Sequence, residues 1–227
     1  MARPPLSEAQ EDYLKQLLLL EEAFGANVPT QALAERLGVK PPSVTEMLKK
    51  LKALGLVEHS PYRGARLTEA GRKVALEVLR HHRLLETYLH QTLGYGWEEV
   101  HEEAERLEHV ISEALEERIA EALGHPPFDP HGDPIPTPEL ILPERPALPL
   151  SEAPLGEARV VRALAQDPGT LNLLAHLHLR PGARLKVLER GAEGVRVEVE
   201  GEVFLLPLEL AQAVGVTSQS ETARPQS

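Results

Sequence analysis

Apolar side chains recur every three to four residues through most of the first half of the chain, which is the pattern of amphipathic helices. The first three segments with this spacing are Ser7 to Ala23, Gln31 to Leu37, and Pro41 to Leu54. Ser7 and Gln10 form a capping-box pattern at the start of the first segment, and Gly38 and Gly55 follow the other two. We therefore expect three helices before residue 56.

After Gly55 the spacing changes to short β-like runs and then returns to a helical period. The expected elements are strands at Leu56–Ser60 and Ala65–Thr68, and helices from Thr68 to about Thr92, from Trp97 to about His109 and from Ser112 to about Leu123. The sequence Pro61-Tyr62-Arg63-Gly64 is expected to form the tip of a hairpin between the two strands. Gly94 and Gly96 separate the long helix from the next one.

The last 100 residues have a different texture. Ten of the thirty residues from His125 to Pro154 are proline, so we expect a connecting segment without regular elements. Strands are expected after it at Arg159–Leu164, Ala183–Glu189, Gly194–Val199 and Glu202–Leu206. About five short strands in this length favour a small β barrel. The final residues, 217–227, are expected to be a disordered tail.

A short helix, a tight turn, a second helix and a hairpin follow one another, and this order is typical of a winged helix-turn-helix domain. The residues between Val28 and Lys73 include nine basic and four acidic side chains, which suits contacts with DNA phosphates. The second helix is expected to enter the major groove. We expect DNA contacts from Lys40, Pro42, Ser43, Thr45, Glu46, Lys49, Lys50 and Arg63. Winged helices also serve as protein-interaction domains, which is the alternative.

The composition narrows the function classes. With 24 basic and 35 acidic side chains the net charge is −11, so the basic segment of +5 leaves −16 for the rest and indicates a second, acidic module. Cysteine is absent, which excludes disulfide frameworks and thiolate zinc sites. The longest leucine run, Leu17–Leu20, is far shorter than the ~20 apolar residues of a membrane span, and no apolar secretion signal is visible. We expect a folded cytoplasmic protein without membrane attachment.

The acidic module contains possible metal ligands. His101, Glu105, Glu108 and His109 fall within one arc of about 100° on the helix expected after Trp97, and the preceding helix carries His82 and Glu86. The latter two are four residues apart, which places them on one helix face. Imidazole rings and carboxylates grouped in this way can converge on a divalent cation. A solvated glutamate-rich surface is the alternative.

Enzyme signatures are missing from the sequence. Neither His-Glu-x-x-His nor His-x-x-Glu-His occurs, and there is no Ser/His/Asp pattern, phosphate-binding loop or Gly-rich fingerprint. We therefore expect no enzyme and no small organic substrate, although a metalloenzyme that uses the His/Glu cluster stays as an alternative. Further possible ligands in the proline-rich segment are His125, Asp129, His131 and Asp133. The prolines around them favour a rigid turn over a second metal loop.

Four features occur in one order: the winged helix, HHRLLETYL, HEEAERLEHV and FDPHGDPIP. Together they resemble the diphtheria toxin repressor family of metal-dependent transcriptional regulators, over residues 6 to about 216. The β-rich segment resembles the Src-homology-3-like domain of the longer members. The resemblance implies a mainly α fold with a winged helix-turn-helix domain at 1–75, a helical dimerisation and metal-binding domain at 76–145 and a Src-homology-3-like β barrel at 146–216. It also implies a homodimer that binds a palindromic operator in double-stranded DNA.

The resemblance also implies two sets of metal ligands. The first set matches His82, Glu86 and His101, with Asp167 where some members have a further ligand from the β-rich domain. Those members have an amide ligand at the position of Thr170, and this amide has no counterpart here. The second set matches Asp12, Glu105, Glu108 and His109. Lys15 stands where some manganese-responsive members have a glutamate ligand, which favours two separated sites over a binuclear one.

The ligand types favour manganese. The iron-responsive branch has methionine and cysteine at the positions of Asp12 and Glu105, whereas this chain has carboxylates at both, like the manganese-responsive branch. Oxygen and imidazole donors without sulfur also suit Mn²⁺. We expect a Mn²⁺-activated repressor of metal-uptake genes, in which the cation ties the first helix to the dimerisation module. An Fe²⁺-dependent repressor and a metal-independent winged-helix regulator are the alternatives.

Overall fold

The computed structural model describes residues 6–25, 27–60, 63–165 and 167–218. It contains two compact units, which are described separately below. The first unit contains the chain up to His82 together with Leu107–Ser112 and Pro136–Leu142, and the second contains Arg83–Arg106, Glu113–Ile135 and the chain from Pro143 onward. Helix α4 (Glu69–Leu93) passes from the first unit into the second.

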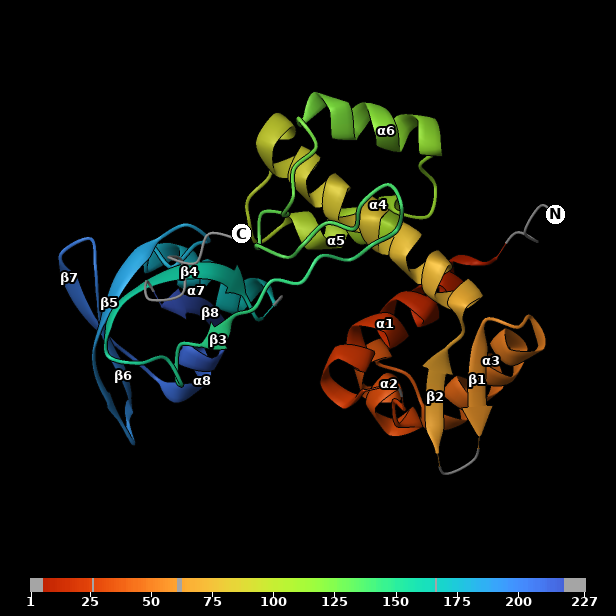
Figure 1. The fold of residues 1–227 in the computed structure, drawn as a ribbon, viewed down its shortest axis with the longest axis horizontal. Coiled ribbons are helices and arrows are strands. Elements are labelled where there is room, and N and C mark those ends of the chain that lie inside the picture. The colour runs from red at the N-terminus through yellow and green to blue at the C-terminus, as the bar shows by residue number, and fades with distance from the viewer. Residues whose placement is uncertain (1–5, 26, 61–62, 166, 219–227) are drawn as a thin grey trace, which may run out of the picture. The chain divides into compact units, whose positions relative to one another are not determined.

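The first unit has the expected order of three helices and a hairpin (Figure 1). Its elements are α1 (Glu8–Phe24), α2 (Thr30–Leu37), α3 (Pro41–Ala53), β1 (Val57–Ser60), β2 (Gly64–Leu67) and the first half of α4. Ser7 caps α1 in the expected capping box with Gln10. Gly38, in the left-handed conformation, ends α2. The hairpin strands pair antiparallel from Val57–Leu67 to Ser60–Gly64, and Pro61 and Tyr62 of the expected tip lie outside the described residues.

One apolar core holds this unit together. It contains the fully buried side chains of Leu14 and Leu17 on α1 and of Val44 and Leu48 on α3. Because these residues lie on the inner stripe of each helix, the amphipathic spacing in the sequence is satisfied by packing α1 directly against the helix-turn-helix. A displacement of α1 therefore also disturbs the packing of α3.

The helical part of the second unit differs from the sequence-based expectation in one place. Helix α5 spans Val100–Leu107, whereas a helix from Trp97 to about His109 was expected, and α6 spans Glu113–Ala122. Residues 97–99 form a turn instead, in which Glu99 accepts a hydrogen bond from the Gly96 backbone. The Trp97 indole is buried and donates to the Pro130 carbonyl.

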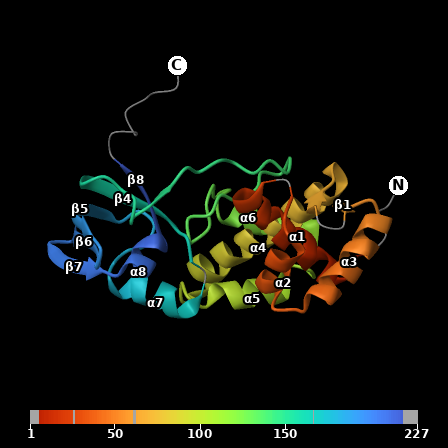
Figure 2. The same cartoon turned by 90° about the horizontal axis from the view of Figure 1, so that it is seen from below.

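A six-stranded antiparallel sheet forms most of the rest of the second unit, with strand order β3-β8-β4-β5-β6-β7. The strands are β3 (Leu148–Pro149), β4 (Gly156–Ala163), β5 (Arg184–Gly191), β6 (Gly194–Val199), β7 (Glu202–Leu206) and β8 (Val214–Ser218). The short helices α7 (Pro168–His176) and α8 (Leu208–Gln212) lie beside these strands in both ribbon views (Figures 1 and 2). Side chains of both helices belong to the core of the sheet.

Three expectations for this region need correction. The chain is helical through α6 and dominated by the sheet after Leu148, so "mainly α" describes only its earlier part. The proline-rich segment does contain a strand, because β3 pairs with β8. Thr217 and Ser218, expected in a disordered tail, belong to β8, and 219–227 lie outside the described residues. The two-residue strand β3 and the five-residue helix α8 are too short to leave a clear periodic pattern in the sequence.

The loop 129–134 contacts strand β4 within the second unit. The Ala163 backbone N–H donates to the His131 carbonyl at 2.8 Å, and Asp133 forms an ion pair with Arg162. Gly132 has a φ of +88°, and a Cβ atom there would lie 2.1 Å from the Val161 carbonyl oxygen. Only glycine allows this close approach. Among the described residues, no helix is both long and apolar enough to cross a membrane.

Candidate metal centre and nucleic-acid interface

The His109 ring lies between two acidic side chains of α1 in the first unit. Its Nε2 atom is 3.0 Å from an Asp12 oxygen, and its Nδ1 atom is 2.8 Å from a Glu11 oxygen. The three residues are brought together because α1 packs beside the turn that follows α5. Asp12 and His109 were expected to be ligands, whereas no pattern in the sequence indicated Glu11, the residue before Asp12.

Glu108 is fully buried next to this ring and has cationic or ring-nitrogen partners at both carboxylate oxygens. Oε1 lies 2.5 Å from the Lys15 ammonium and 3.3 Å from His109 Nε2, and Oε2 lies 2.6 Å from His82 Nδ1. One ligand atom each from Asp12, Glu108 and His109 lies within 4.8 Å of the others. Two carboxylates and one imidazole at this separation fit the donor preference of a divalent transition metal.

The surroundings strongly affect the proton on His109. Burial disfavours the charged ring, but hydrogen bonds to Asp12 and Glu11 and the charge of Glu108 outweigh burial and raise the pKa of His109 to about 10. The ring is therefore an imidazolium at neutral pH in this arrangement. Since a ring nitrogen must be deprotonated to bind a metal, metal binding here has to release a proton.

The second unit contains a further group of candidate ligands around Glu86 on α4. His101 Nδ1 lies 3.1 Å from one Glu86 oxygen and His131 Nδ1 lies 3.6 Å from the other. His101 Nε2 is also 3.8 Å from Glu105, one turn later on α5. His82 precedes Glu86 by one turn of α4, as the i, i+4 spacing requires, and is the last residue of the first unit. Glu86 and His131 are both buried.

The loop after α6 forms a turn at Pro130 and His131, and the preference for a rigid turn over a second metal loop stays a prediction. The Asp129 carboxylate accepts hydrogen bonds from the backbones of His131 and Asp133, and His125 precedes the turn as an exposed residue. The turn also brings ligand atoms of Asp129 and His131 within 4.8 Å of Glu86, which the sequence analysis did not anticipate. Burial, together with the charges of Glu86 and Asp133, raises the pKa of Asp129.

The surroundings of His131 in this turn also raise the pKa of its ring. Burial opposes the charged ring, but the hydrogen bond and charge of Glu86 prevail and raise the pKa of His131 to about 9.

Asp167, proposed as a further ligand, is exposed and caps helix α7, where it accepts from the Thr170 backbone at 2.8 Å. These backbone and side-chain hydrogen bonds lower the pKa of the Asp167 carboxyl.

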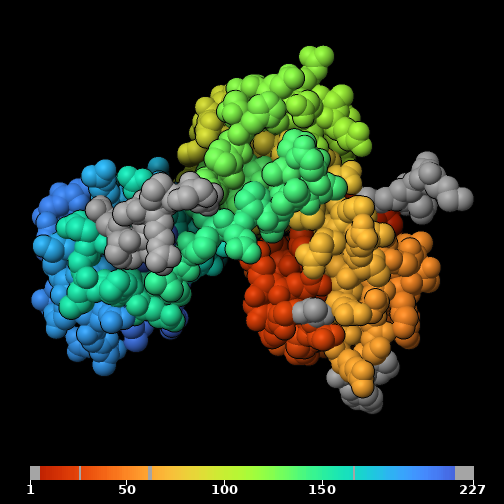
Figure 3. Space-filling view, viewed as in Figure 1, coloured from red at the N-terminus to blue at the C-terminus, as the bar shows by residue number. Residues whose placement is uncertain are grey.

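The residues expected to contact DNA lie on one side of α3 and on the hairpin. Seven of the eight are exposed, and Thr45 is half-buried with its hydroxyl donating to the Pro41 carbonyl. Lys49 forms an ion pair with Glu46 at 2.6 Å, in which both side chains remain largely exposed. The space-filling view shows this orange segment at the surface of the first unit (Figure 3).

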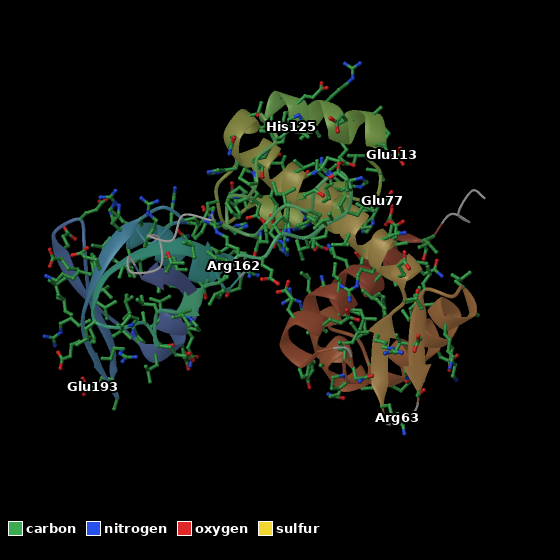
Figure 4. The ribbon with its side chains drawn as sticks, viewed as in Figure 1. Arg63, Glu77, Glu113, His125, Arg162 and Glu193 are labelled. Atoms are coloured by element: carbon green, nitrogen blue, oxygen red, sulfur yellow. The ribbon has the colours of Figure 1, made fainter. Side chains whose placement is uncertain are left out.

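The hairpin places further cations next to α3. Lys52 donates to the His59 carbonyl on β1, and Arg66 on β2 forms an ion pair with Glu58. Arg63 lies at the far end of the hairpin and projects away from it (Figure 4). A basic helix face and a basic hairpin end on one unit provide a surface that is complementary to phosphates.

Three family models match the chain. They are the N-terminal DNA-binding domain of iron-dependent repressors at residues 5–65, the metal-binding and dimerisation domain of the same repressors at 68–137, and the FeoA domain at 148–218. The iron-dependent repressor IdeR of Mycobacterium tuberculosis is 36% identical over 225 residues, covering 93% of this chain and 97% of that protein. The diphtheria toxin repressor of Corynebacterium diphtheriae is 36% identical over 131 residues, or 58% of each chain.

Solved structures give the same result. A manganese-dependent transcriptional repressor in complex with manganese has a TM-score of 0.85 and 40% identity, covering 92% of this chain and 99% of that chain. The manganese regulator SloR has a TM-score of 0.77 and 32% identity, with 92% and 98% covered. The similarity thus extends over nearly the whole length of IdeR and of the two manganese-dependent structures, and over about half of the diphtheria toxin repressor.

Proposed function

Because this chain belongs to the family of metal-dependent transcriptional repressors that includes IdeR and the diphtheria toxin repressor, we propose that it is a Mn²⁺-activated repressor. The family consists of DNA-binding regulators rather than enzymes, and its domains bind double-stranded DNA, bind divalent metal and form dimers. The specific proposals are the metal, its ligands, a palindromic operator and repression of metal-uptake genes in the cytoplasm. The proposed domains are 1–75, 76–145 and a Src-homology-3-like barrel at 146–216.

The contact between His109 and Asp12 is the observation that carries the proposal. It joins α1, which shares its core with the helix-turn-helix, to the turn after α5. We assign Asp12, Glu105, Glu108 and His109 to the activating site. A bound divalent cation supplies charge that neutralises these carboxylates. The protein residues then hold α1, and with it α3, in one arrangement, which reduces the spread of positions of the DNA-reading helix.

A second, ancillary site is assigned to His82, Glu86 and His101, with Asp167 as a possible additional ligand from the β-rich domain. The hydrogen bond between Glu86 and His101 supports two of these assignments. The N-cap role of Asp167 is a competing use of that carboxylate, because its Oδ1 atom already accepts from the Thr170 backbone. We therefore assign Asp167 only a supporting part.

Manganese is favoured by the donor set. The ligand atoms proposed for the activating site are carboxylate oxygens and an imidazole nitrogen, and the chain has no cysteine. The manganese-dependent repressor among the similar structures supports the same choice. Fe²⁺ accepts similar donors, and the relatives named for iron dependence keep it as the second candidate.

The decisive experiment measures operator binding by the full-length protein as a function of added metal. A candidate operator is selected from random DNA, and its affinity is measured with chelator and with Mn²⁺, Fe²⁺, Co²⁺ or Zn²⁺. The proposal expects tight binding that requires metal, and that occurs when free Mn²⁺ is buffered at its cellular level but not when free Zn²⁺ is buffered at its own cellular level. Equal binding in chelator would favour the metal-independent regulator instead.

A further inference from the structure

Lys15 is a charged side chain in the core of the first unit. It is 1% exposed on α1, between the buried residues Leu14 and Leu17. Removing an ammonium group from water is costly unless a partner compensates its charge. The Glu108 carboxylate provides that compensation at 2.5 Å. The pair spans 93 positions of the chain and links α1 to the turn after α5.

The same carboxylate belongs to the group that can hold a metal ion. Glu108 Oε1 contacts the Lys15 ammonium and lies 3.3 Å from His109 Nε2, and ligand atoms of Glu108, His109 and Asp12 lie within 4.8 Å of one another. Glu108 Oε2 is taken by His82 Nδ1 at 2.6 Å. A cation that binds Glu108 therefore approaches a carboxylate that already pairs with the Lys15 side chain.

We infer that Lys15 is an internal cation of the metal centre, which competes with the metal ion for Glu108 and so raises the metal concentration at which the centre fills. When metal is scarce, the ammonium neutralises the buried carboxylate. When metal binds, Lys15 and the metal share or exchange Glu108, and their mutual repulsion weakens metal binding. That this competition raises the metal concentration needed to activate the repressor rests on the proposed function. The competition between Lys15 and the metal ion for Glu108 does not.

The consequence is specific to charge rather than to packing. Replacing Lys15 by methionine keeps an unbranched side chain of similar length but removes the positive charge. The buried Glu108 carboxylate then loses its lysine partner, which destabilises the metal-free protein and leaves the carboxylate more available to metal. Two measurements should therefore move in opposite directions: stability without metal falls and affinity for metal rises.

The test measures Mn²⁺ binding to full-length protein by electron paramagnetic resonance of the free ion, without DNA. Lys15→Met should lower the Kd of the Glu108 site by at least about tenfold, because two positive charges a few ångströms apart no longer repel. Lys15→Arg, which retains the charge, should keep the wild-type Kd within about threefold. Lys73→Met is the matched control, because Lys73 is an exposed lysine of the same unit that pairs with Glu69 on its own helix.

Thermal unfolding in chelator supplies the second readout. Lys15→Met should unfold at a lower temperature than wild type in chelator, and saturating Mn²⁺ should restore more stability to it than to wild type. If this variant does not fold, Lys15→Gln, which can still donate to Glu108, is used with the same expectations. An unchanged or weaker Mn²⁺ affinity in the folded neutral variant would overturn the proposal and leave Lys15 a purely structural residue. Because no DNA is present, this result is independent of the operator experiment.

Discussion

The Nε2 atom of His109 lies 3.0 Å from an Asp12 oxygen, although the two residues are 97 positions apart in the chain. Asp12 is on α1, whose buried leucines belong to the same apolar core as the buried side chains of α3, and His109 follows α5. This contact therefore connects the candidate metal centre to the helix that is expected to read DNA.

Removing the Asp12 carboxylate should uncouple metal binding from DNA binding. Asp12→Ala should leave a folded dimer whose Mn²⁺ affinity falls at least about tenfold, since even outer partners of metal ligands cost that much. Operator binding should then be weak at Mn²⁺ concentrations that saturate wild type. The measurement is operator affinity against Mn²⁺ concentration, with Glu8→Ala as an exposed acidic control on the same helix. Coincident curves for Asp12→Ala and wild type would show that the ligand assignment is wrong.

Softer donors should change the metal preference. The double variant Asp12→Met with Glu105→Cys replaces two carboxylates by a thioether and a thiolate, which bind borderline ions such as Fe²⁺ better than Mn²⁺. Under anaerobic conditions the ratio of Fe²⁺ to Mn²⁺ needed for half-maximal operator binding should fall by about tenfold or more. The control is Glu102→Cys, on an exposed face of α5. An unaltered ratio would mean that neither side chain touches the activating ion.

Mn²⁺ binding should become tighter as the pH rises. With the pKa of His109 raised to about 10, its ring is charged at pH 7 and must lose a proton to coordinate. Between pH 6.5 and 8.5 the Kd should fall by about tenfold per pH unit, with about one proton released per ion. Calorimetry in buffers of different ionisation enthalpy measures that proton directly. A Kd independent of pH over this window would show that His109 is already neutral or does not bind the metal.

The raised pKa of His109 should also make the metal-free protein less stable as the pH rises. A folded-state pKa raised above the ordinary value of about 6.5 stabilises the fold fully below that pH. This contribution is lost as the pH rises through about 10, and His131, at about 9, adds to the loss. Unfolding by denaturant in chelator should therefore show decreasing stability from pH 7 to pH 9.5. His109→Gln should reduce this slope; the same slope in that variant would refute the assignment of its pKa.

DNA contacts should divide into phosphate and base contacts. Lys49→Ala should weaken binding to operator and to nonspecific DNA similarly. It should also reduce the slope of log affinity against log salt concentration by about one. Thr45→Ala should instead change the preference among operator variants. Fluorescence anisotropy at several salt concentrations separates the two effects, with Lys186→Ala on the β-rich sheet as a control for net charge. Specificity lost with Lys49→Ala, and nonspecific binding kept, would contradict the expected orientation of α3.

Gly132 should be irreplaceable for the packing of the second unit. Gly132→Ala forces a left-handed φ on a side chain that collides with the Val161 carbonyl, so a loss of at least about 3 kcal/mol is expected. Gly124→Ala is the matched control, because Gly124 has a φ of +72° but open space around its Cβ position, and should cost about 1–2 kcal/mol. Denaturant unfolding measures both. Equal losses would show that the loop can move away from β4.

The sequence alone determined the local elements and the chemistry of the ligands. The capping box at Ser7, the glycine end of α2 and the helical spacing of α1 and α3 are short-range signals, and these elements appear as expected. The i, i+4 spacing of His82 and Glu86 likewise follows from helix geometry. Where the signal was short or contested, as for β3, α8 and the start of α5, the expected elements were wrong or missing.

Only the tertiary structure decided which distant residues meet. Nothing in the spacing of α1 distinguishes Glu11 as a neighbour of the candidate metal centre, and only the family resemblance pointed to the position of Lys15, because a lysine is usually an exposed residue. Packing α1 beside the turn after α5 buried Lys15 against Glu108 and placed Glu11 against His109. Long-range packing selects these pairs because the free energy of a buried charge depends on its neighbours in space, which a local pattern does not encode.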